Sequence, residues 1–397
     1  MTERLYYTDP SRLDFDATVI SCDEHQGRLH VVLNRTAFYP TSGGQPFDTG
    51  RLGPVDIVDV IDRDDDEVVH VATAALPIGS TVMGEVDSAR RLDHTQQHTG
   101  QHVLSAAFDR LARAATVSFH MGGEVSTIDL SRDVGAAEID AAEAEANRIV
   151  WEDRPVSIRF ASAEEAATMG LRKASLRSGR LRLIDIAAFD LSACGGTHVS
   201  RTGSIGTIAV SGAERFKGGT RVSFLCGART LRSHRTLRNI VAGVTRALSV
   251  VPAEIETAVE RMQAEAKARD KAVRTLQQEL TGYRADSLVA SAEAIGHLSV
   301  VSRIEPALDG AALKQLAMVV VEGRSLLAVF VGGGTPAPIV IARSPEVKVD
   351  AAALLRAVTD KFGGRGGGKP DFAQGGISAM PADVLDAVRG FLSEKFS

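Results

Sequence analysis

Two short motifs, almost a hundred residues apart, constrain the fold of this 397-residue chain more than any other feature. In the first, His98 and His102 are spaced i, i+4, which on a helix places both imidazoles on one face. In the second, Cys194 and His198 flank a Gly-Gly pair that can turn both side chains toward one point. Three imidazoles and a thiolate form a ligand set suited to Zn2+. We therefore expect one Zn2+ per chain and a fold that brings the two motifs together.

The number of metal ligands is open at this point, because His94 lies one helical turn before His98. His94 can replace one of the four ligands, support one of them, or face a substrate. Three protein ligands would leave a position for water, whereas four would close the shell. The glutamate of an HExxH motif is absent, since Thr99, Gly100 and Gln101 fill the gap. A zincin protease is therefore excluded.

The composition is that of a globular protein, with 44% hydrophobic residues and a net charge of -5. No apolar run reaches membrane-spanning length, and the first residues lack the apolar core of a signal peptide. The three cysteines are too few for a disulfide framework. We expect a cytoplasmic protein without a membrane partner.

The order of periodic segments predicts a multidomain α+β fold. Residues 1–88 contain short alternating runs separated by turn signals, which is typical of a small β-barrel. Residues 89–227 interleave helices with strands, beginning with a helix over 94–113, and are expected to form an α+β domain that holds the zinc. Residues 297–397 predict a glycine-rich α/β domain that binds tRNA or mediates dimerisation.

Residues 228–296 are predicted to form two long helices interrupted at Pro252. Apolar residues from Ile255 to Tyr283 follow a 4-3 rhythm, which indicates an a/d seam. Such a seam fits a helical hairpin within the chain or a coiled coil between two chains. A homodimer through this coiled coil, or through the C-terminal domain, is therefore one expected outcome.

Basic residues concentrate in the middle of this acidic chain. The stretch from Arg172 to Arg182 contains five basic residues and no acid, and arginines recur at every third position from Arg229 to Arg238. Such clusters fit a polyanion partner, although solvated surfaces carry them as often. The glycine-rich loop expected at 363–376 can expose backbone N–H groups to phosphate, so we expect nucleotide binding, including ATP. It is not a Walker A loop, because no Gly-Lys-Ser/Thr opens a helix there.

Three motifs in this order resemble a known family. Phe38-Tyr-Pro-x-x-Gly-Gly-Gln45, His98-Thr-Gly-Gln-His102 and Cys194-Gly-Gly-Thr-His198 are similar to the editing domain of alanyl-tRNA synthetases. The resemblance is closer still to free-standing alanyl-tRNA editing proteins of the long AlaX type. The glycine-rich stretch at 363–376 is similar to a C-terminal domain that these synthetases share with DHH-family phosphoesterases. The aminoacylation core and the DHH phosphoesterase domain are absent from the sequence.

The resemblance implies an aminoacyl-tRNA deacylase that hydrolyses the ester of tRNA(Ala) wrongly charged with serine, or in some members with glycine. The expected partner is therefore mischarged tRNA(Ala). The implied zinc ligands are His98, His102, Cys194 and His198. Ser118, on the strand after the metal helix, is expected to bond the seryl hydroxyl. The residues assigned to substrate binding are Thr36, Gly43, Gly44, Gln45, Ser118 and Arg221, and those assigned to ordering the attacking water are His94, Gln101 and His120.

Gly100, the smallest residue in the HTGQH motif, is expected to leave room for a bulky adenosine. Two other functions are compatible with part of the pattern. One is a zinc-stabilised module that binds tRNA without hydrolysing anything. The other is a zinc hydrolase of small-molecule esters, for which the basic middle of the chain would have no purpose.

Overall fold

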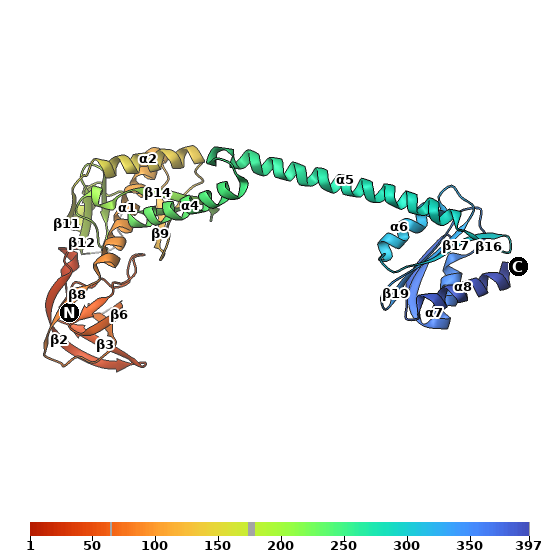
Figure 1. Ribbon diagram of the computed structural model, residues 1–397. Helices are drawn as coiled ribbons and strands as arrows, with labels where there is room; N and C mark the ends of the chain where they lie inside the picture. The colour runs from red at the N-terminus through yellow and green to blue at the C-terminus, as the bar shows by residue number, and fades with distance from the viewer. Residues whose placement is uncertain (64–65, 174–178, 397) are drawn as a thin grey trace. The chain divides into compact units, whose positions relative to one another are not determined.

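A computed structural model describes residues 1–63, 66–173 and 179–396. The chain divides into two compact units, Met1–Ala247 and Leu248–Ser397. Among the described residues, no helix is both long and apolar enough to cross a bilayer. Figure 1 shows the first unit in red to green and the second in green to blue.

The first part of unit one is a closed six-stranded barrel in the order β2-β3-β7-β6-β5-β8. Buried and exposed side chains alternate along strands such as β8, because successive residues of a strand point to opposite faces. The predicted small barrel is therefore confirmed. Its strands are β2 (Asp14–His25), β3 (Arg28–Leu33), β5 (Gly50–Leu52), β6 (Val55–Asp62), β7 (Val68–Ala72) and β8 (Thr81–Val86). Beside it lie β1 (Glu3–Arg4), paired in parallel with β4 (Arg35–Thr36), and the 3-10 helix η1 (Leu5–Tyr7).

The helix α1 (Ser88–Ala112) follows the barrel directly and is the central element of unit one. It begins at Ser88, not at residue 94 as expected, because Asp87 caps it by accepting hydrogen bonds from the N–H groups of Ala89 and Arg90. The first turns of α1 are polar, so the spacing of apolar residues did not predict them. They pack against the barrel, where Arg91 is buried.

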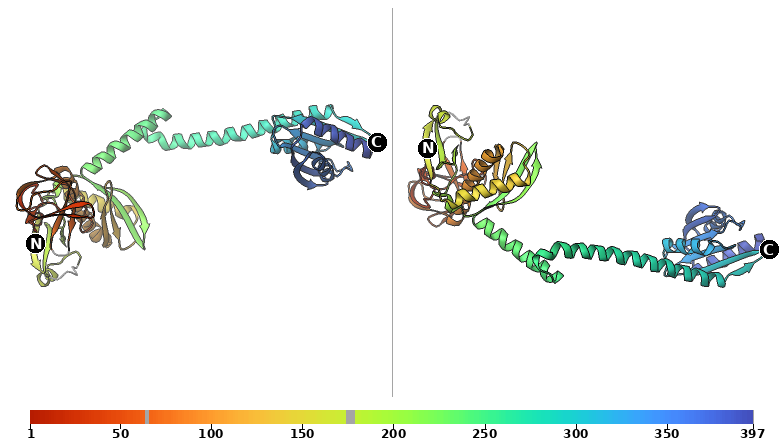
Figure 2. Two further views of the ribbon diagram at one scale, coloured as in Figure 1. Left: turned by 90° about the horizontal axis from the view of Figure 1, so that it is seen from below. Right: turned by 90° about the horizontal axis from the view of Figure 1, so that it is seen from above.

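Two antiparallel sheets complete the fold around α1. The sheet β14-β15-β10-β9 packs its apolar face on α1 and α2, and the smaller sheet β11-β12-β13 leads into the second motif. Figure 2 shows these elements from two further sides. They are β9 (Thr116–Met121), β10 (Ser126–Leu130), α2 (Ala136–Trp151), β11 (Val156–Ser162), α3 (Ala163–Thr168), β12 (Arg180–Ile186), β13 (Asp190–Ala193), η2 (Thr202–Ile205), β14 (Ile208–Phe216), β15 (Gly219–Cys226) and α4 (Ala228–Leu248).

The second unit is a mixed six-stranded sheet in the order β16-β17-β18-β19-β21-β20. Helices α7 and α8 pack on one face, while α6 and the end of α5 pack on the other (Figure 1). This architecture agrees with the predicted α/β arrangement. The elements are η3 (Pro252–Glu254), α5 (Ile255–Ala290), β16 (Glu293–Ile295), β17 (Leu298–Glu305), α6 (Gly310–Val321), β18 (Leu327–Gly332), β19 (Ala337–Arg343), α7 (Ala351–Phe362), β20 (Gly364–Lys369), β21 (Phe372–Ile377) and α8 (Pro381–Phe396).

The glycine-rich stretch at 363–376 forms a β-hairpin and not the expected loop, while phosphate binding there stays a prediction. β20 and β21 pair in antiparallel register from Gly364↔Ile377 to Lys369↔Phe372. Half of the backbone N–H groups of an edge strand such as β20 are thereby used in the ladder. ATP binding stays a prediction without structural support.

The predicted a/d seam lies on α5, and most of its side chains are exposed. The exposed members are Val259, Met262, Val273, Leu276, Leu280 and Tyr283. The coiled coil and the homodimer therefore stay predictions. The basic stripe on α4 is partly corrected, because Arg229 is buried and ion-paired with Asp93 at 2.6 Å. Only Arg232, Arg235 and Arg238 present exposed side chains.

Candidate metal centre and its pocket

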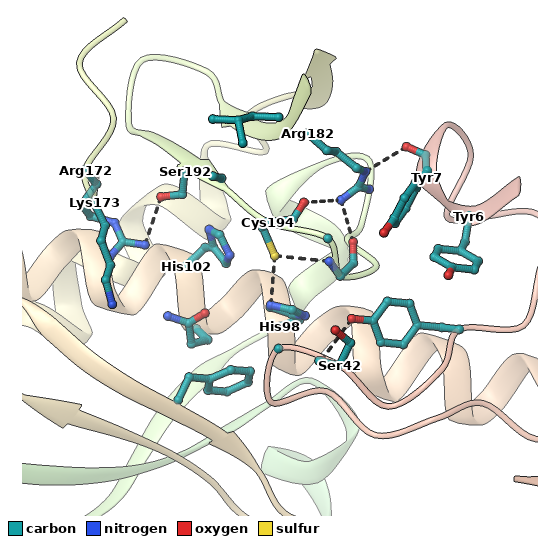
Figure 3. A pocket seen from close by; sticks show the side chains of 18 of the residues that line it. Tyr6, Tyr7, Ser42, His98, His102, Arg172, Lys173, Arg182, Ser192 and Cys194 are labelled. Carbon is teal, nitrogen blue, oxygen red and sulfur yellow. Dashed lines mark hydrogen bonds between the residues drawn. The ribbon is translucent and has the colours of Figure 1, made fainter. Parts of the chain in front are cut away.

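The four expected ligands converge on one point. One ligand atom from each of His98, His102, Cys194 and His198 lies within 4.8 Å of the others. α1 supplies the first two residues, and the segment after β13 supplies the other two. The Sγ atom of Cys194 lies 3.3 Å from Nε2 of His98 (Figure 3). The same atom lies 3.3 Å from Nε2 of His198. The two motifs are far apart in the sequence, and β12 and β13 bring the second one back to α1.

Each of the three imidazoles is oriented by an oxygen atom at Nδ1. The partners are Gln45 Oε1 at 2.8 Å for His98, Asp190 Oδ2 at 3.1 Å for His102 and Thr99 Oγ1 at 3.2 Å for His198. A metal-binding histidine usually donates its second ring N–H to such an oxygen, which fixes the tautomer and the ring orientation. The arrangement therefore leaves Nε2 as the free nitrogen of each ring.

The donor set fits a zinc ion. Burial alone would raise the pKa of the Cys194 thiol, but the imidazoles of His98 and His198 hold that pKa well below its usual range. Burial lowers the pKa of His198 to about 3, which keeps this imidazole neutral at neutral pH. Burial opposes a charge on His102, but its hydrogen bonds to Asp190 and Cys194 raise its pKa to about 9, so zinc binding would release a proton from this ring. A thiolate and imidazoles in a buried cluster are the ligands that tetrahedral zinc sites use. Zinc binding itself remains a proposal.

Position 196 must be glycine because the loop that carries Cys194 and His198 lies so close to His98 that no side chain fits there. A Cβ atom on Gly196 would collide with the His98 ring and would lie 3.0 Å from Gln45 Oε1. At Gly195, in contrast, the nearest atom to a Cβ would be the Tyr7 hydroxyl at 3.9 Å, which is ordinary contact. The two neighbouring glycines therefore differ in what they tolerate.

We expect Gly196→Ala to weaken Zn2+ binding by roughly ten- to a hundredfold, comparable to the loss of a residue that orients a ligand. The displaced His98 ring would lose both its aim and its bond to Gln45. The measurement is Zn2+ affinity by competition with a chromogenic chelator. Gly195→Ala is the matched control and should bind as the parent does; equal affinities for both variants would refute the steric argument.

A cavity of about 700 Å³ opens beside the cluster. Figure 3 shows Arg172 and Lys173 on one side of Cys194, and Tyr6 and Tyr7 on the other. Of the residues assigned from the sequence, the cavity is lined by His98, His102, Cys194, Gln101, Gly43 and Ser118. A cavity of this size accommodates one aminoacyl nucleoside.

Gln45 lies behind the metal cluster instead of lining the cavity. It is fully buried, and its Nε2 donates to Thr197 Oγ1 at 2.8 Å. Its Oε1 accepts from both His98 Nδ1 and the Thr197 N–H. Gln45 is therefore a positioning residue, which corrects its assignment to the substrate. The carbonyl of Gly44 accepts from the Met121 N–H at 3.0 Å, so Gly44 docks its loop on β9.

Thr36 and Arg221 also lie away from the cavity lining. Thr36 is fully buried in the barrel region, where its hydroxyl lies 2.7 Å from Nε2 of His70. Arg221 forms a two-bond ion pair with Asp129 on the neighbouring strand. We therefore no longer assign a substrate contact to either residue. Gly100 packs against the Cys226 thiol, so its small size serves the core and makes no room for adenosine.

The residues expected to order water have different environments. Gln101 lines the cavity, with Nε2 donating to Ser105 Oγ at 2.8 Å. His120 is exposed on β9 outside the cavity lining. His94 is buried at the junction with the barrel, 3.9 Å from Asp48, and burial lowers its pKa to about 4. His94 is outside the four-ligand cluster and is neutral at neutral pH. Its position fits packing between α1 and the barrel better than contact with a substrate.

Several residues of the site were missed by sequence reasoning. Asp190, which orients His102, is held by Arg172 at 2.7 Å. Arg182 is buried and donates to the carbonyls of Cys194 and Gly196, and so supports the metal-ligand loop. The position of Asp190 shortly before Cys194 was an available signal. Arg182 gave none, because it belongs to the basic stretch that we interpreted as surface; Arg177 of that stretch lies outside the described residues.

Comparison with known proteins shows which families this chain resembles. Residues 181–223 match the "Threonyl and Alanyl tRNA synthetase second additional domain", and residues 298–397 match the "DHHA1 domain". The chain is 28% identical to "Alanyl-tRNA editing protein AlaX-L" from Pyrococcus horikoshii, over 97% of this chain and 97% of that protein. The chain is thus similar to an alanyl-tRNA editing protein of the long AlaX type over nearly the whole length of both proteins.

Alanine–tRNA ligases are also similar to this chain. It is 34% identical to the ligase from Methanothrix thermoacetophila, over 94% of the chain and 42% of the ligase. It is 32% identical to the ligase from Archaeoglobus fulgidus, over 99% of the chain and 44% of the ligase. The chain thus spans less than half the length of these relatives.

Proposed function

We propose that this protein is an aminoacyl-tRNA deacylase that removes serine, and also glycine, from wrongly charged tRNA(Ala). The observation that carries the proposal is the convergence of four ligand side chains, each imidazole fixed at Nδ1, beside a cavity lined by Ser118. The editing proteins and ligases that resemble the chain support it. A protein acting on charged tRNA belongs in the cytoplasm.

His98, His102, Cys194 and His198 would hold one Zn2+, with all four donors on the protein. When bound, the ion would supply a fixed positive charge beside the ester, and with four protein donors it would act as a Lewis acid only by expanding to five ligands. An aminoacyl ester is already activated, so the remaining residues need only position the substrate and a water molecule. The amide of Gln101, anchored to Ser105 by Nε2, offers Oε1 as an acceptor for that water.

Ser118 would provide the discrimination between serine and alanine. Its hydroxyl can donate to and accept from a seryl hydroxyl, and alanine would leave it without a partner. Sites that bond a substrate hydroxyl can reject the analogue lacking it by about four orders of magnitude. Glycine also lacks the hydroxyl, so its removal would depend on the small size of its side chain.

The test is single-turnover deacylation of Ser-, Gly- and Ala-tRNA(Ala). We expect Ser-tRNA(Ala) to be hydrolysed at least about a hundredfold faster than Ala-tRNA(Ala), and Ser118→Ala to reduce that ratio. Thr127→Ala, on the neighbouring strand and outside the cavity lining, is the control. If no substrate is deacylated above the spontaneous rate, the proposed function fails. Binding of tRNA without hydrolysis would then identify a binding module.

A further inference from the structure

An aromatic side chain lies exposed at the edge of the cavity. Phe160 of β11 lines the cavity yet keeps 39% of its surface exposed. The Cζ atom of Arg180, on the neighbouring strand β12, lies 4.6 Å from the centre of the Phe160 ring. The strand register explains the contact, because Phe160 pairs with Arg182 and Arg180 lies diagonally across. The guanidinium thus lies over one face of the ring, and both side chains border the cavity.

The cations at this edge are free of carboxylates. Lys173 and Arg180 are exposed, line the cavity and have no ion pair with any described residue. Arg172, immediately before Lys173, is instead tied to Asp190 and supports the metal cluster. Arg159, on the opposite face of β11 from Phe160, is neutralised by Asp185 at 3.0 Å. Unpaired positive charge is therefore found on the cavity side of the sheet, next to the exposed ring.

An exposed aromatic ring with unpaired cations is the combination that binds single-stranded nucleic acid. Bases stack on aromatic rings and on arginine planes, while nearby cations contact the backbone phosphates. A cavity of about 700 Å³ has room for one terminal aminoacyl nucleoside, so the preceding nucleotides must lie outside it. Phe160 and Arg180 offer such a strand a stacking surface at the border of the cavity.

We propose that Phe160 and Arg180 stack a base of the single-stranded RNA that precedes the terminal nucleoside, and that Lys173 contacts its phosphate. The inference rests on the proposed function, in that the terminal nucleoside occupies the cavity. It adds a second subsite, which binds the RNA strand and takes no part in the ester chemistry. Affinity for tRNA, and not the rate of hydrolysis, is what this subsite supplies.

The first test separates the strand from the ester. Phe160→Ala should raise the KM for Ser-tRNA(Ala) by roughly tenfold, because loss of one stacked base costs about that factor, and should leave kcat unchanged. The hydrolysis of 3′-O-seryl-adenosine, which has no preceding nucleotides, should be unaffected. Phe160→Tyr should retain the affinity, whereas Phe160→Leu, which keeps an apolar side chain but no flat ring, should not. Trp151→Ala removes an exposed aromatic outside the cavity lining and is the control.

The second test is direct binding of a short single-stranded RNA ending in CCA, measured by fluorescence anisotropy. Phe160→Ala should weaken binding by roughly tenfold. Lys173→Ala should lower the slope of log affinity against log salt by about 0.7, the value for one phosphate contact of a single strand. Arg159→Ala should change neither quantity.

Two results would overturn the subsite: unchanged oligonucleotide affinity in Phe160→Ala, or equal loss of activity on seryl-adenosine and on tRNA. A parent protein that binds the oligonucleotide through Phe160 but hydrolyses no ester would refute the proposed function and retain the subsite. Hydrolysis of Ser-tRNA(Ala) with no effect of Phe160→Ala would do the reverse.

Discussion

Cys194→Ser is expected to lose Zn2+ and, with it, the deacylase activity. The thiolate is the only anionic donor of the cluster, and it lies 3.3 Å from two of the three imidazole nitrogens. A serine hydroxyl stays protonated and is a poor zinc ligand. Because residues that merely orient a ligand contribute ten- to a hundredfold to affinity, loss of a ligand should cost at least about a hundredfold. Metal content and Zn2+ affinity are the quantities to measure.

Cys22→Ser is the matched control, since Cys22 is a half-buried thiol of the barrel outside the cluster. It should retain one Zn2+ per chain and full activity. A Cys194→Ser protein that holds stoichiometric Zn2+ with parental affinity would remove Cys194 from the ligand set. Retained metal with lost activity would instead point to a role for the thiol in the reaction.

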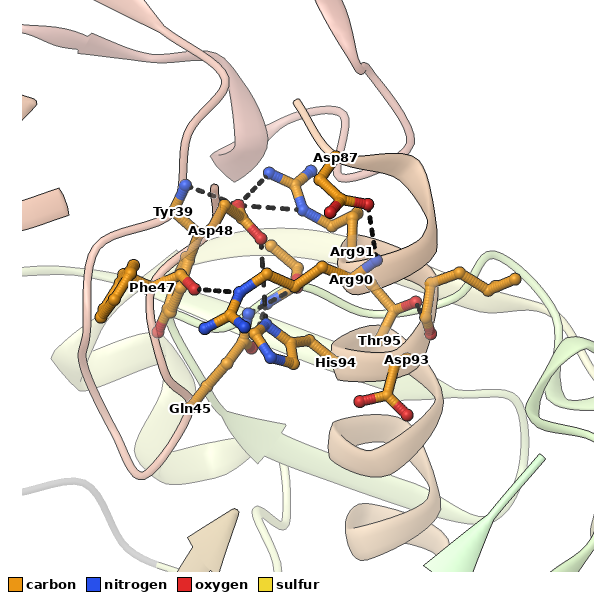
Figure 4. A network of polar contacts seen from close by, with 12 residues as sticks. Tyr39, Gln45, Phe47, Asp48, Asp87, Arg90, Arg91, Asp93, His94 and Thr95 are labelled. Carbon is orange, nitrogen blue, oxygen red and sulfur yellow. Dashed lines mark hydrogen bonds and ion pairs between the residues drawn. The ribbon is translucent and has the colours of Figure 1, made fainter. Parts of the chain in front are cut away.

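Asp48→Ala should destabilise unit one by about 3–5 kcal/mol, the range for breaking a buried ion pair. Asp48 is fully buried, and its Oδ2 accepts from Nε of Arg91 at 3.1 Å and from the Tyr39 N–H at 2.8 Å (Figure 4). Arg91 is 3% exposed and also donates to the carbonyls of Pro10 and Ala37. Without Asp48 its charge would remain buried with only neutral acceptors. The free energy of unfolding in urea is the measurement.

The control for Asp48 is Asp56→Ala, which breaks the exposed pair with Arg51. Exposed pairs contribute about 0–1 kcal/mol, so this variant should unfold at nearly the parental urea concentration. Similar losses in the two variants would contradict a buried ion pair at the junction between barrel and α1.

The sequence predicted those elements whose pattern is local. The alternation of barrel strands and the i, i+4 spacing of His98 and His102 reflect periodicities that each segment carries by itself. The start of α1 was missed because its polar residues, such as Arg91, are buried against the barrel. Burial of a polar residue against a distant segment produces no periodic apolar pattern in the sequence. The hairpin at 364–377 was mistaken for a loop because glycine disfavours strands, a preference that the pairing of β20 with β21 overrides here.

The same distinction holds for the candidate site. The convergence of the two motifs followed from their chemistry, since a thiolate and imidazoles are jointly useful only when they meet. The sequence did not predict whether Gln45 faces the substrate or the metal ligands, because an amide next to a Gly-Gly pair can bond either a substrate or a histidine. Asp190 and Thr99 act through the histidines that they orient, and Arg182 acts through the backbone carbonyls of Cys194 and Gly196. Such roles depend on distances that the spacing of residues in the sequence does not encode.

Gln45 belongs to the barrel half of unit one, yet its single carbonyl oxygen receives N–H groups from both metal-binding segments, at His98 and at Thr197. The barrel half therefore contributes a side chain that supports the ion site, in addition to the two segments that carry the ligands. A fragment beginning at α1 would keep all four ligands but release the His98 ring to rotate. A transplanted editing unit should therefore include residues 1–88, because Gln45, which holds the His98 ring, belongs to that segment.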